Sequence, residues 1–151
     1  MYAFLNILWK MSKELLWELT VKNEVESKHL VKSRLFQNET PYCIRFEGLL
    51  GSGKTYFCKC IANLYGIEDI ASNSFLKYSL NKGSKKIFHV DYYYMDNPVE
   101  FFYNHIHEQI DDHSLILSEW TPNNLVMDIP QFTLKIAIVK KSERKITFYR
   151  N

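Results

Sequence analysis

The chain of 151 residues is poor in cysteine and glycine, and it carries no strong excess of charge of either sign. Its three cysteines, Cys43, Cys58 and Cys60, show neither disulfide nor zinc-site spacing, which favours a reduced, cytoplasmic protein. A formal net charge of +2 permits contact with RNA but does not predict it. Repeats, low-complexity segments and linkers are also absent, so the length predicts one domain with a real hydrophobic core.

The chain also has no long hydrophobic run. Residues 1–9 are apolar, but they lack a basic leader and a small-residue cleavage site, and they are too short to span a bilayer as a helix. We therefore expect no membrane segment. Met11 opens an ordinary-looking start, so residues 1–10 are either an upstream extension or a small extra helix. We assign residues 1–17 to an N-terminal extension of uncertain status and residues 18–151 to the domain.

The scarce glycines are concentrated in one motif. The run Gly48-Leu49-Leu50-Gly51-Ser52-Gly53-Lys54-Thr55 fits G-x-x-x-x-G-K-[ST], the phosphate-binding P-loop. Glycines let backbone N–H groups crowd around phosphate oxygens, because no Cβ stands in the way. Lys54 can reach the β- and γ-phosphates, the Thr55 hydroxyl can ligate Mg²⁺, and the following helix adds the positive end of its dipole.

The segments around this motif are those that a P-loop requires. Residues 42–47 read as a strand entering the loop, and residues 55–65 as the helix leaving it, with Gly66 as its stop. Further strands are expected at 17–21, 85–91, 114–118, 132–138 and 145–149. Helices are expected after Asn23 and after Asn97, a looser stretch at 67–80 and a turn at 81–84. This order predicts an α/β fold: a P-loop NTPase-type domain with a mostly parallel sheet, flanking helices and a C-terminal antiparallel hairpin.

Two carboxylates stand at the ends of predicted strands, where ligands gather in such sheets. Asp91 ends an apolar strand, as the Mg²⁺-holding acid of P-loop NTPases does. Glu119 follows the strand at 114–118 and could orient the attacking water or hold the metal's water shell. Ser74 lies in a polar loop where a hydroxyl can sense the γ-phosphate and Mg²⁺. Each of these side chains also has a plain alternative as a solvated strand-end or turn residue.

Other candidates carry weaker signals. His89 leaves its strand on the same face as Asp91, and either a bridge to metal-bound water or a core histidine fits it. Cys58 and Cys60 lie two residues apart on a helix, so their side chains diverge by about 200° and shared metal ligation is not expected. The same holds for His105 and His107. The run of tyrosines at 92–94 reads as a partly buried aromatic cluster rather than a base-stacking platform.

In this order, the motifs resemble those of the bacterial TsaE (YjeE) family. That family pairs a P-loop with a Ser-Pro-Thr switch loop, an H-x-D-x-Y-R strand exit and a late Glu-Trp. The chain has the P-loop, then Ser72-Asn73-Ser74-Phe75, His89-Val90-Asp91-Tyr92-Tyr93-Tyr94 and Ser118-Glu119-Trp120. Asn73 and Ser74 replace the switch proline and threonine, Tyr94 replaces the arginine, and Leu49 replaces the acidic residue of the P-loop. Arg144 falls near a late basic position of the family.

The resemblance implies a cytoplasmic Mg²⁺-dependent ATPase of tRNA threonylcarbamoyladenosine biosynthesis, working with homologues of TsaB and TsaD and meeting tRNA only through that complex. It implies catalytic roles for Lys54, Asp91 and Glu119, and Mg²⁺ ligation by Thr55, Asp91 and Glu119. The motif and the resemblance together predict an ATP site formed by Leu50, Gly51, Ser52, Gly53, Lys54, Thr55, Tyr56, Ser74 and Trp120.

Two alternatives remain open at this stage. A small P-loop kinase acting on a metabolite would need a phosphate-clamping lid with several arginines, and residues 92–118 contain none. A nucleotide-binding scaffold without catalysis, a degenerate relative, is favoured by Asn73 and Tyr94. The charge of Lys54 and the metal would dominate catalysis in an ATPase, because phosphoryl transfer asks little covalent chemistry of the protein.

Overall fold

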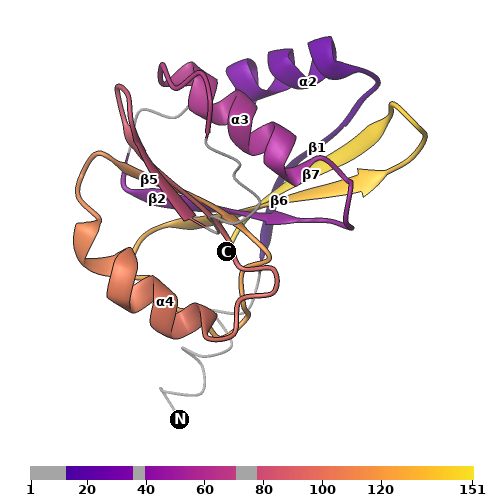
Figure 1. The fold of residues 1–151 in the computed structure, drawn as a ribbon. Coiled ribbons are helices and arrows are strands. Elements are labelled where there is room, and N and C mark those ends of the chain that lie inside the picture. The colour runs from indigo at the N-terminus through magenta and orange to yellow at the C-terminus, as the bar shows by residue number, and fades with distance from the viewer. Residues whose placement is uncertain (1–12, 36–39, 71–77) are drawn as a thin grey trace.

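Strand β2 (Tyr42–Glu47) lies at the centre of a seven-stranded sheet in the computed structural model, which describes residues 13–35, 40–70 and 78–151 (Figure 1). The strand order is β1-β7-β6-β2-β5-β4-β3. The other strands are β1 (Glu14–Val21), β3 (Tyr78–Lys82), β4 (Lys86–Asp91), β5 (Ser114–Glu119), β6 (Gln131–Ile138) and β7 (Arg144–Arg150). The helices are α2 (Glu24–Leu30), the π-helical turn η1 (Val31–Leu35), α3 (Lys54–Leu64), α4 (Pro98–His105) and the short 3₁₀ turn η2 (His107–Gln109).

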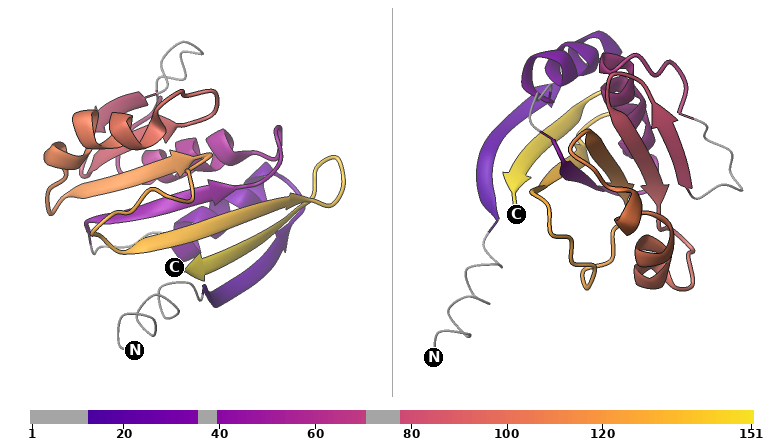
Figure 2. Two further views of the ribbon diagram at one scale, coloured as in Figure 1. Left: turned by 90° about the horizontal axis from the view of Figure 1, so that it is seen from below. Right: turned by 90° about the vertical axis from the view of Figure 1, so that its left-hand side faces the viewer.

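The middle of the sheet is parallel and its two sides are antiparallel. Strand β2 pairs in parallel with β5 and β6, and β4 pairs in parallel with β5. Antiparallel pairing joins β1 to β7, β6 to β7 and β3 to β4. Figure 2 shows the yellow β6–β7 hairpin beside the indigo β1 at one edge of the sheet. The predicted α/β fold and its C-terminal hairpin are confirmed. The sheet is mixed rather than mostly parallel, because three of its six strand pairings in the described residues are antiparallel.

Helices cover both faces of the sheet, so the central strands are buried on both sides. Helices α2 and α3 lie on one face and α4 lies on the other (Figure 1). Strand β5 is buried along its whole length, as expected for a parallel central strand. Its side chains alternate: Leu115 and Leu117 join the core under α2 and α3, whereas Ile116 joins the core under α4.

The same alternation positions the candidate site. In β4, Ile87 packs in the core under α3, and Phe88 and Val90 pack in the core under α4. Side chains two residues apart on a strand share a face, so His89 and Asp91 face α3 together with Ile87. Glu119 shares that face with Leu115 and Leu117 by the same rule. The pattern of the two strands therefore directs three polar side chains towards the start of α3.

The boundaries of several elements differ from those expected. Strand β1 begins at Glu14, three residues before the predicted start, because the chain there pairs with the last residues of β7. The stretch expected to be loose at 67–80, and the turn at 81–84, contain strand β3, which pairs with β4 and ends at Lys82. The register of this pairing places Asn81 opposite Ile87, so Asn81 and Lys82 belong to the strand, contrary to prediction.

Helix α3 is predicted to within one residue at each end. Asn23 caps α2 as expected, since its side chain accepts a hydrogen bond from the Glu26 amide at 2.9 Å. Among the residues that the structure describes, no helix is both long and apolar enough to cross a membrane.

Candidate functional site

The P-loop leaves the carboxyl end of β2 and turns into α3, and its glycines are required by the backbone. A Cβ at Gly48 would lie 2.6 Å from the Ile136 carbonyl oxygen and 2.5 Å from Ser52 Oγ, so no larger residue fits without movement. Gly51 and Gly53 have φ values of 76° and 108°, which other residues rarely adopt. The loop is thus a tight turn whose shape depends on these three positions.

Lys54 begins α3 and bends back over the loop. Its Nζ donates to the Gly48 carbonyl at 2.7 Å and to the Leu49 carbonyl at 2.9 Å, and it lies 4.3 Å from the centroid of the Trp120 ring. Burial lowers the pKa of the Lys54 ammonium, an effect opposed by the carboxylates of Glu119 and Asp91. The charge that a phosphate group would need is therefore held inside the loop itself.

Ser52 offers the loop a further polar group. Its Oγ is buried and has no hydrogen-bond partner among the described residues. Its carbonyl accepts a hydrogen bond from Arg144 Nε at 2.9 Å, across from the β6–β7 turn. Because a buried hydroxyl without a partner carries an energetic cost, this atom is suited to a ligand that supplies an acceptor or a donor there.

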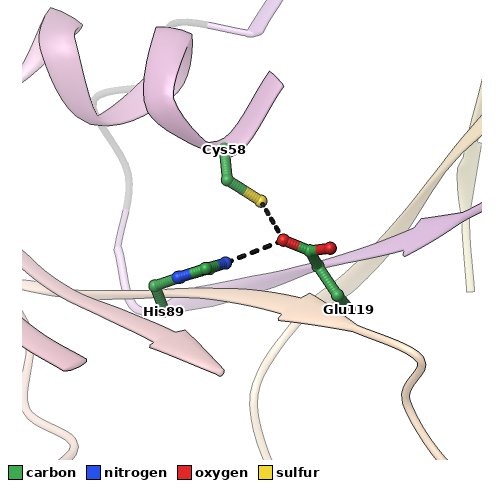
Figure 3. A group of neighbouring side chains, drawn as sticks. All are labelled: Cys58, His89 and Glu119. Carbon is green, nitrogen blue, oxygen red and sulfur yellow. Dashed lines mark hydrogen bonds and ion pairs between the residues drawn. The ribbon is translucent and has the colours of Figure 1, made fainter. Parts of the chain in front are cut away.

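Glu119 contacts three other side chains of the site, and it is only 3% exposed. Thr55 Oγ1 donates to its Oε2 at 3.1 Å. His89 Nε2 lies 2.8 Å and Cys58 Sγ 3.7 Å from its Oε1 (Figure 3). Both oxygens of this buried carboxylate are therefore matched with donors, as a buried negative charge requires.

Asp91 stands beside Glu119 at the ends of two parallel strands. The two residues are register partners between β4 and β5. Asp91 Oδ1 accepts a hydrogen bond from the Tyr93 amide at 2.9 Å, which fixes the carboxylate at the strand exit. Two carboxylates and the Thr55 hydroxyl, close to one lysine, form an oxygen-rich donor set of the kind that Mg²⁺ accepts.

An aromatic group borders this site. The ring of Trp120 lies 4.8 Å from that of Tyr93, and Tyr93 lies 4.0 Å from Tyr94. Tyr94 and Trp120 both have positive φ values, 58° and 54°, which are uncommon for such residues. Tyr92 is separate: it is buried in the core under α4. The predicted cluster therefore divides between the core and the surface.

A cleft of about 300 Å³ opens beside the loop, between the ends of β2 and β5. Its lining is Arg45, Phe46, Glu47, Gly48, Trp120, Thr121 and Asn123. Arg45 is held in place by Gln131 and by the Leu125 carbonyl. The cleft gives the P-loop an adjoining space bounded by an aromatic ring.

Most of the predicted site residues are thus brought together. Lys54, Thr55, Asp91, Glu119 and Trp120 surround the carboxyl ends of β4 and β5. Tyr56 is the exception, because its hydroxyl turns away from the loop and donates to the Glu24 carbonyl at 3.3 Å. Ser74, the predicted switch hydroxyl, and the rest of residues 71–77 lie outside the described residues.

The sequence pattern did not reveal the roles of two residues. The sequence suggests Cys60 as the candidate partner of Cys58, but Cys58 contacts Glu119, and its spacing of three residues from Thr55 on one helix is the signal for this contact. The sequence gives Arg144 only a position near a basic residue of the family. The structure joins it to the Ser52 carbonyl and to the carbonyls of Lys140 and Lys141, so it links the P-loop to the β6–β7 turn.

The P-loop motif predicts that this loop binds phosphate, and loosening the Arg144 link should weaken that predicted binding. In Arg144→Lys the charge stays, but one ammonium cannot match the planar guanidinium that connects Ser52 to the turn. We expect ATP affinity to fall by about tenfold, the equivalent of one hydrogen bond to a charged group, ~1.5 kcal/mol. Isothermal titration calorimetry would measure it. Arg150→Lys, in an exposed ion pair with Glu14, is the matched control. Equal affinity in both variants would show that Arg144 does not support the loop.

Comparisons with known proteins show which proteins this chain is similar to. The family model described as "Threonylcarbamoyl adenosine biosynthesis protein TsaE" matches residues 18–146. The chain is 28% identical over 145 residues to the tRNA threonylcarbamoyladenosine biosynthesis protein TsaE of Aquifex aeolicus (strain VF5), an alignment covering 91% of this chain and 98% of that protein. The crystal structure of Bacillus subtilis YdiB is similar with a TM-score of 0.65 and 26% identity, covering 92% of this chain and 87% of that one.

Proposed function

Because this chain belongs to the TsaE family, we propose that it is a Mg²⁺-dependent ATPase that serves tRNA threonylcarbamoyladenosine biosynthesis. The resemblance read from the sequence motifs is confirmed by the family match and by the relative in Aquifex aeolicus. The finer assignment, ATP hydrolysis in a cytoplasmic complex with homologues of TsaB and TsaD, is our proposal. The observation that carries it is the meeting of Lys54, Thr55, Asp91 and Glu119 at one end of the sheet.

The residues of the loop suit a bound triphosphate. Lys54 supplies a buried positive charge, Ser52 a buried hydroxyl without a partner among the described residues, and Gly48 a position where a Cβ would clash. Phosphate oxygens can replace the Gly48 and Leu49 carbonyls that Lys54 now contacts. The N-terminus of α3 adds N–H groups and a positive dipole end.

The donor set at the strand ends suits Mg²⁺ in the same way. Thr55, Asp91 and Glu119 would hold the ion, which would supply positive charge against the phosphates in the transition state. For this the Thr55 hydroxyl has to release Glu119 Oε2, to which it now donates. Glu119 would then orient a water molecule or accept its proton, and Lys54 would stabilise the developing charge.

The proposed site lacks one charged group that partner proteins could supply. Tyr94 stands where the family has an arginine, and it is 83% exposed. This replacement removes one candidate for stabilising the transition state, and such groups are often supplied in trans. The proposal is therefore that homologues of TsaB and TsaD complete the site, and that tRNA meets the chain through them.

We expect the purified chain to hydrolyse ATP poorly and both partners together to stimulate it by at least about 10²-fold, the lower end of what one added charge-stabilising group contributes. Steady-state phosphate release, with and without the two partners, would measure this. The Lys54→Ala variant in the same mixture controls for ATPase activity of the partners. Fast turnover that partners leave unchanged would contradict the proposal and favour the metabolite kinase.

Two other results would separate the alternatives. Tight ATP binding without turnover in any mixture would favour the non-catalytic scaffold. The presence of Tyr94 in place of the family's arginine is the observation that favours this alternative. Co-purification of TsaB and TsaD homologues with the tagged chain from its native cells would support the partner assignment. Their absence from such a preparation, with the tagged chain folded and binding ATP, would contradict it.

A further inference from the structure

Three side chains with the donor atoms of a zinc site meet directly behind the P-loop. Cys58 comes from α3, His89 from β4 and Glu119 from β5, and Figure 3 shows the first two directed at one oxygen of the third. One ligand atom from each residue lies within 4.8 Å of the others. All three are buried, with Cys58 fully enclosed.

Two of the three distances between donor atoms are within about 1 Å of those in a tetrahedral zinc centre. Zinc bonds of about 2.3 Å to sulfur and about 2.0–2.2 Å to nitrogen and oxygen place neighbouring ligand atoms roughly 3.4–3.6 Å apart. The distance from Cys58 Sγ to Glu119 Oε1 is 3.7 Å, already near this value. The distance from His89 Nε2 to Glu119 Oε1 is 2.8 Å, a hydrogen bond that an inserted ion would open by well under ~1 Å.

The donor types of this group differ from those of the proposed Mg²⁺ site, with which it shares Glu119. Sulfur and imidazole nitrogen are preferred by Zn²⁺ and similar ions, whereas Mg²⁺ takes oxygen ligands. A thiolate and a carboxylate would also balance the two positive charges of the ion. Three rigid elements hold the three donors, so little ordering would be needed on binding.

We propose that Cys58, His89 and Glu119 bind a Zn²⁺-type ion and that this ion takes Glu119 away from ATP hydrolysis. On binding, the Cys58 thiol loses its proton to solvent and its sulfur bonds the ion. The proton on His89 Nε2 moves to Nδ1 through solvent, and Nε2 becomes a ligand. The binding of the ion stands alone, while its inhibitory effect rests on the proposed role of Glu119.

The state of Cys58 without an ion agrees with this exchange. The Cys58 thiol donates a hydrogen bond to Glu119 Oε1 at 3.7 Å when no cation is present. A divalent ion supplies the positive charge that stabilises the thiolate and takes the place of that proton.

Metal titration of the whole chain, freed of metal and without nucleotide, tests the site. The probe is Zn²⁺ in competition with a chromophoric indicator, and the variants are Cys58→Ser and Cys60→Ser. Serine keeps a hydroxyl that can donate to Glu119, and thermal unfolding checks that each variant folds. We expect one Zn²⁺ per chain for the parent and Cys60→Ser, and at least about tenfold weaker binding for Cys58→Ser. Loss of a residue that only hydrogen-bonds to a metal ligand already lowers metal affinity by about 10–100-fold, and Cys58 is proposed as a ligand itself.

Co²⁺ identifies the ligand directly, because a thiolate bonded to cobalt gives a charge-transfer absorption. We expect this band in the parent and in Cys60→Ser, and its loss in Cys58→Ser. Equal Zn²⁺ affinity in all three proteins, no Zn²⁺ binding by the parent, or Co²⁺ binding without the band would overturn the proposal. In ATPase assays, the parent should be inhibited at Zn²⁺ concentrations at least about tenfold lower than Cys58→Ser, following the same loss of a ligand.

Different results would contradict the proposed ATPase function and the proposed zinc site. A chain that binds no ATP would contradict the proposed function but would leave the zinc titration as it is. Zinc inhibition of the same strength in the parent and in Cys58→Ser would remove the inhibitory site while ATP hydrolysis remained.

Discussion

The Lys54→Ala variant should lose at least about tenfold in ATP affinity, and often ~100-fold, since a hydrogen bond to a charged group is worth about 1.5–3 kcal/mol. Lys54 contributes charge to the loop rather than packing to the core: its Nζ contacts two carbonyls and the face of Trp120. The free energy of unfolding should fall by no more than about 2 kcal/mol, because the variant loses hydrogen bonds only to the Gly48 and Leu49 carbonyls, and Leu49 is an exposed residue.

Calorimetric ATP titration and thermal unfolding of the same preparation would measure both effects. Lys82→Ala, an exposed lysine in β3 outside the site, is the matched control and should bind ATP as the parent does. Undiminished ATP affinity in a folded Lys54→Ala protein would remove the P-loop assignment. A large loss of stability would instead give Lys54 a structural role that its contacts do not suggest.

Asp91→Asn and Glu119→Gln should fail in different ways. The asparagine side chain in Asp91→Asn carries no charge, so one charged ligand of the proposed Mg²⁺ site is lost. ATP binding should therefore lose most of its dependence on Mg²⁺. Glu119→Gln replaces the carboxylate proposed to act on water with an uncharged amide side chain. Turnover should therefore slow by about 10²–10⁴-fold, with ATP binding largely kept.

The hydrogen bonds of Glu119 predict a further effect of the Glu119→Gln variant, on stability. Its carboxylate accepts from Thr55, Cys58 and His89, whereas an amide can accept only through its one oxygen. Glu119→Gln should therefore also lower the unfolding midpoint, and the binding data must be taken below it. Asp96→Asn, at an exposed acid five residues after the end of β4, is the control. If both site variants hydrolysed ATP at the parent rate in the presence of the partners, the site would be misassigned.

The site could be predicted from sequence where chemistry follows from regular geometry. The P-loop glycines and Lys54 form a local motif, so their positions depend on few distant contacts. His89, Asp91 and Glu119 follow from the period of two in β4 and β5 and from the parallel pairing of these strands. The periodicity left open whether His89 bridges to metal-bound water or is a core histidine bonded to backbone. The structure shows it buried, with Nε2 2.8 Å from the Glu119 carboxylate.

Other parts depend on long-range packing that the local pattern does not carry. Strand β3 forms because β4 offers an unpaired edge, although Asn81, Lys82 and Gly83 resemble a turn. Arg144 reaches the loop only because the β6–β7 turn lies beside it, 92 residues away along the chain. Cys58 contacts Glu119 because α3 crosses the end of β5. A pattern read along one segment cannot place such partners.

The most direct test of the account is equilibrium binding of a non-hydrolysable ATP analogue to the whole chain, measured with and without Mg²⁺. We expect one nucleotide per chain, bound more tightly when Mg²⁺ is present, and a loss of that difference in Asp91→Asn. Absence of binding under both conditions, or binding that Mg²⁺ leaves unchanged in the parent, would contradict it.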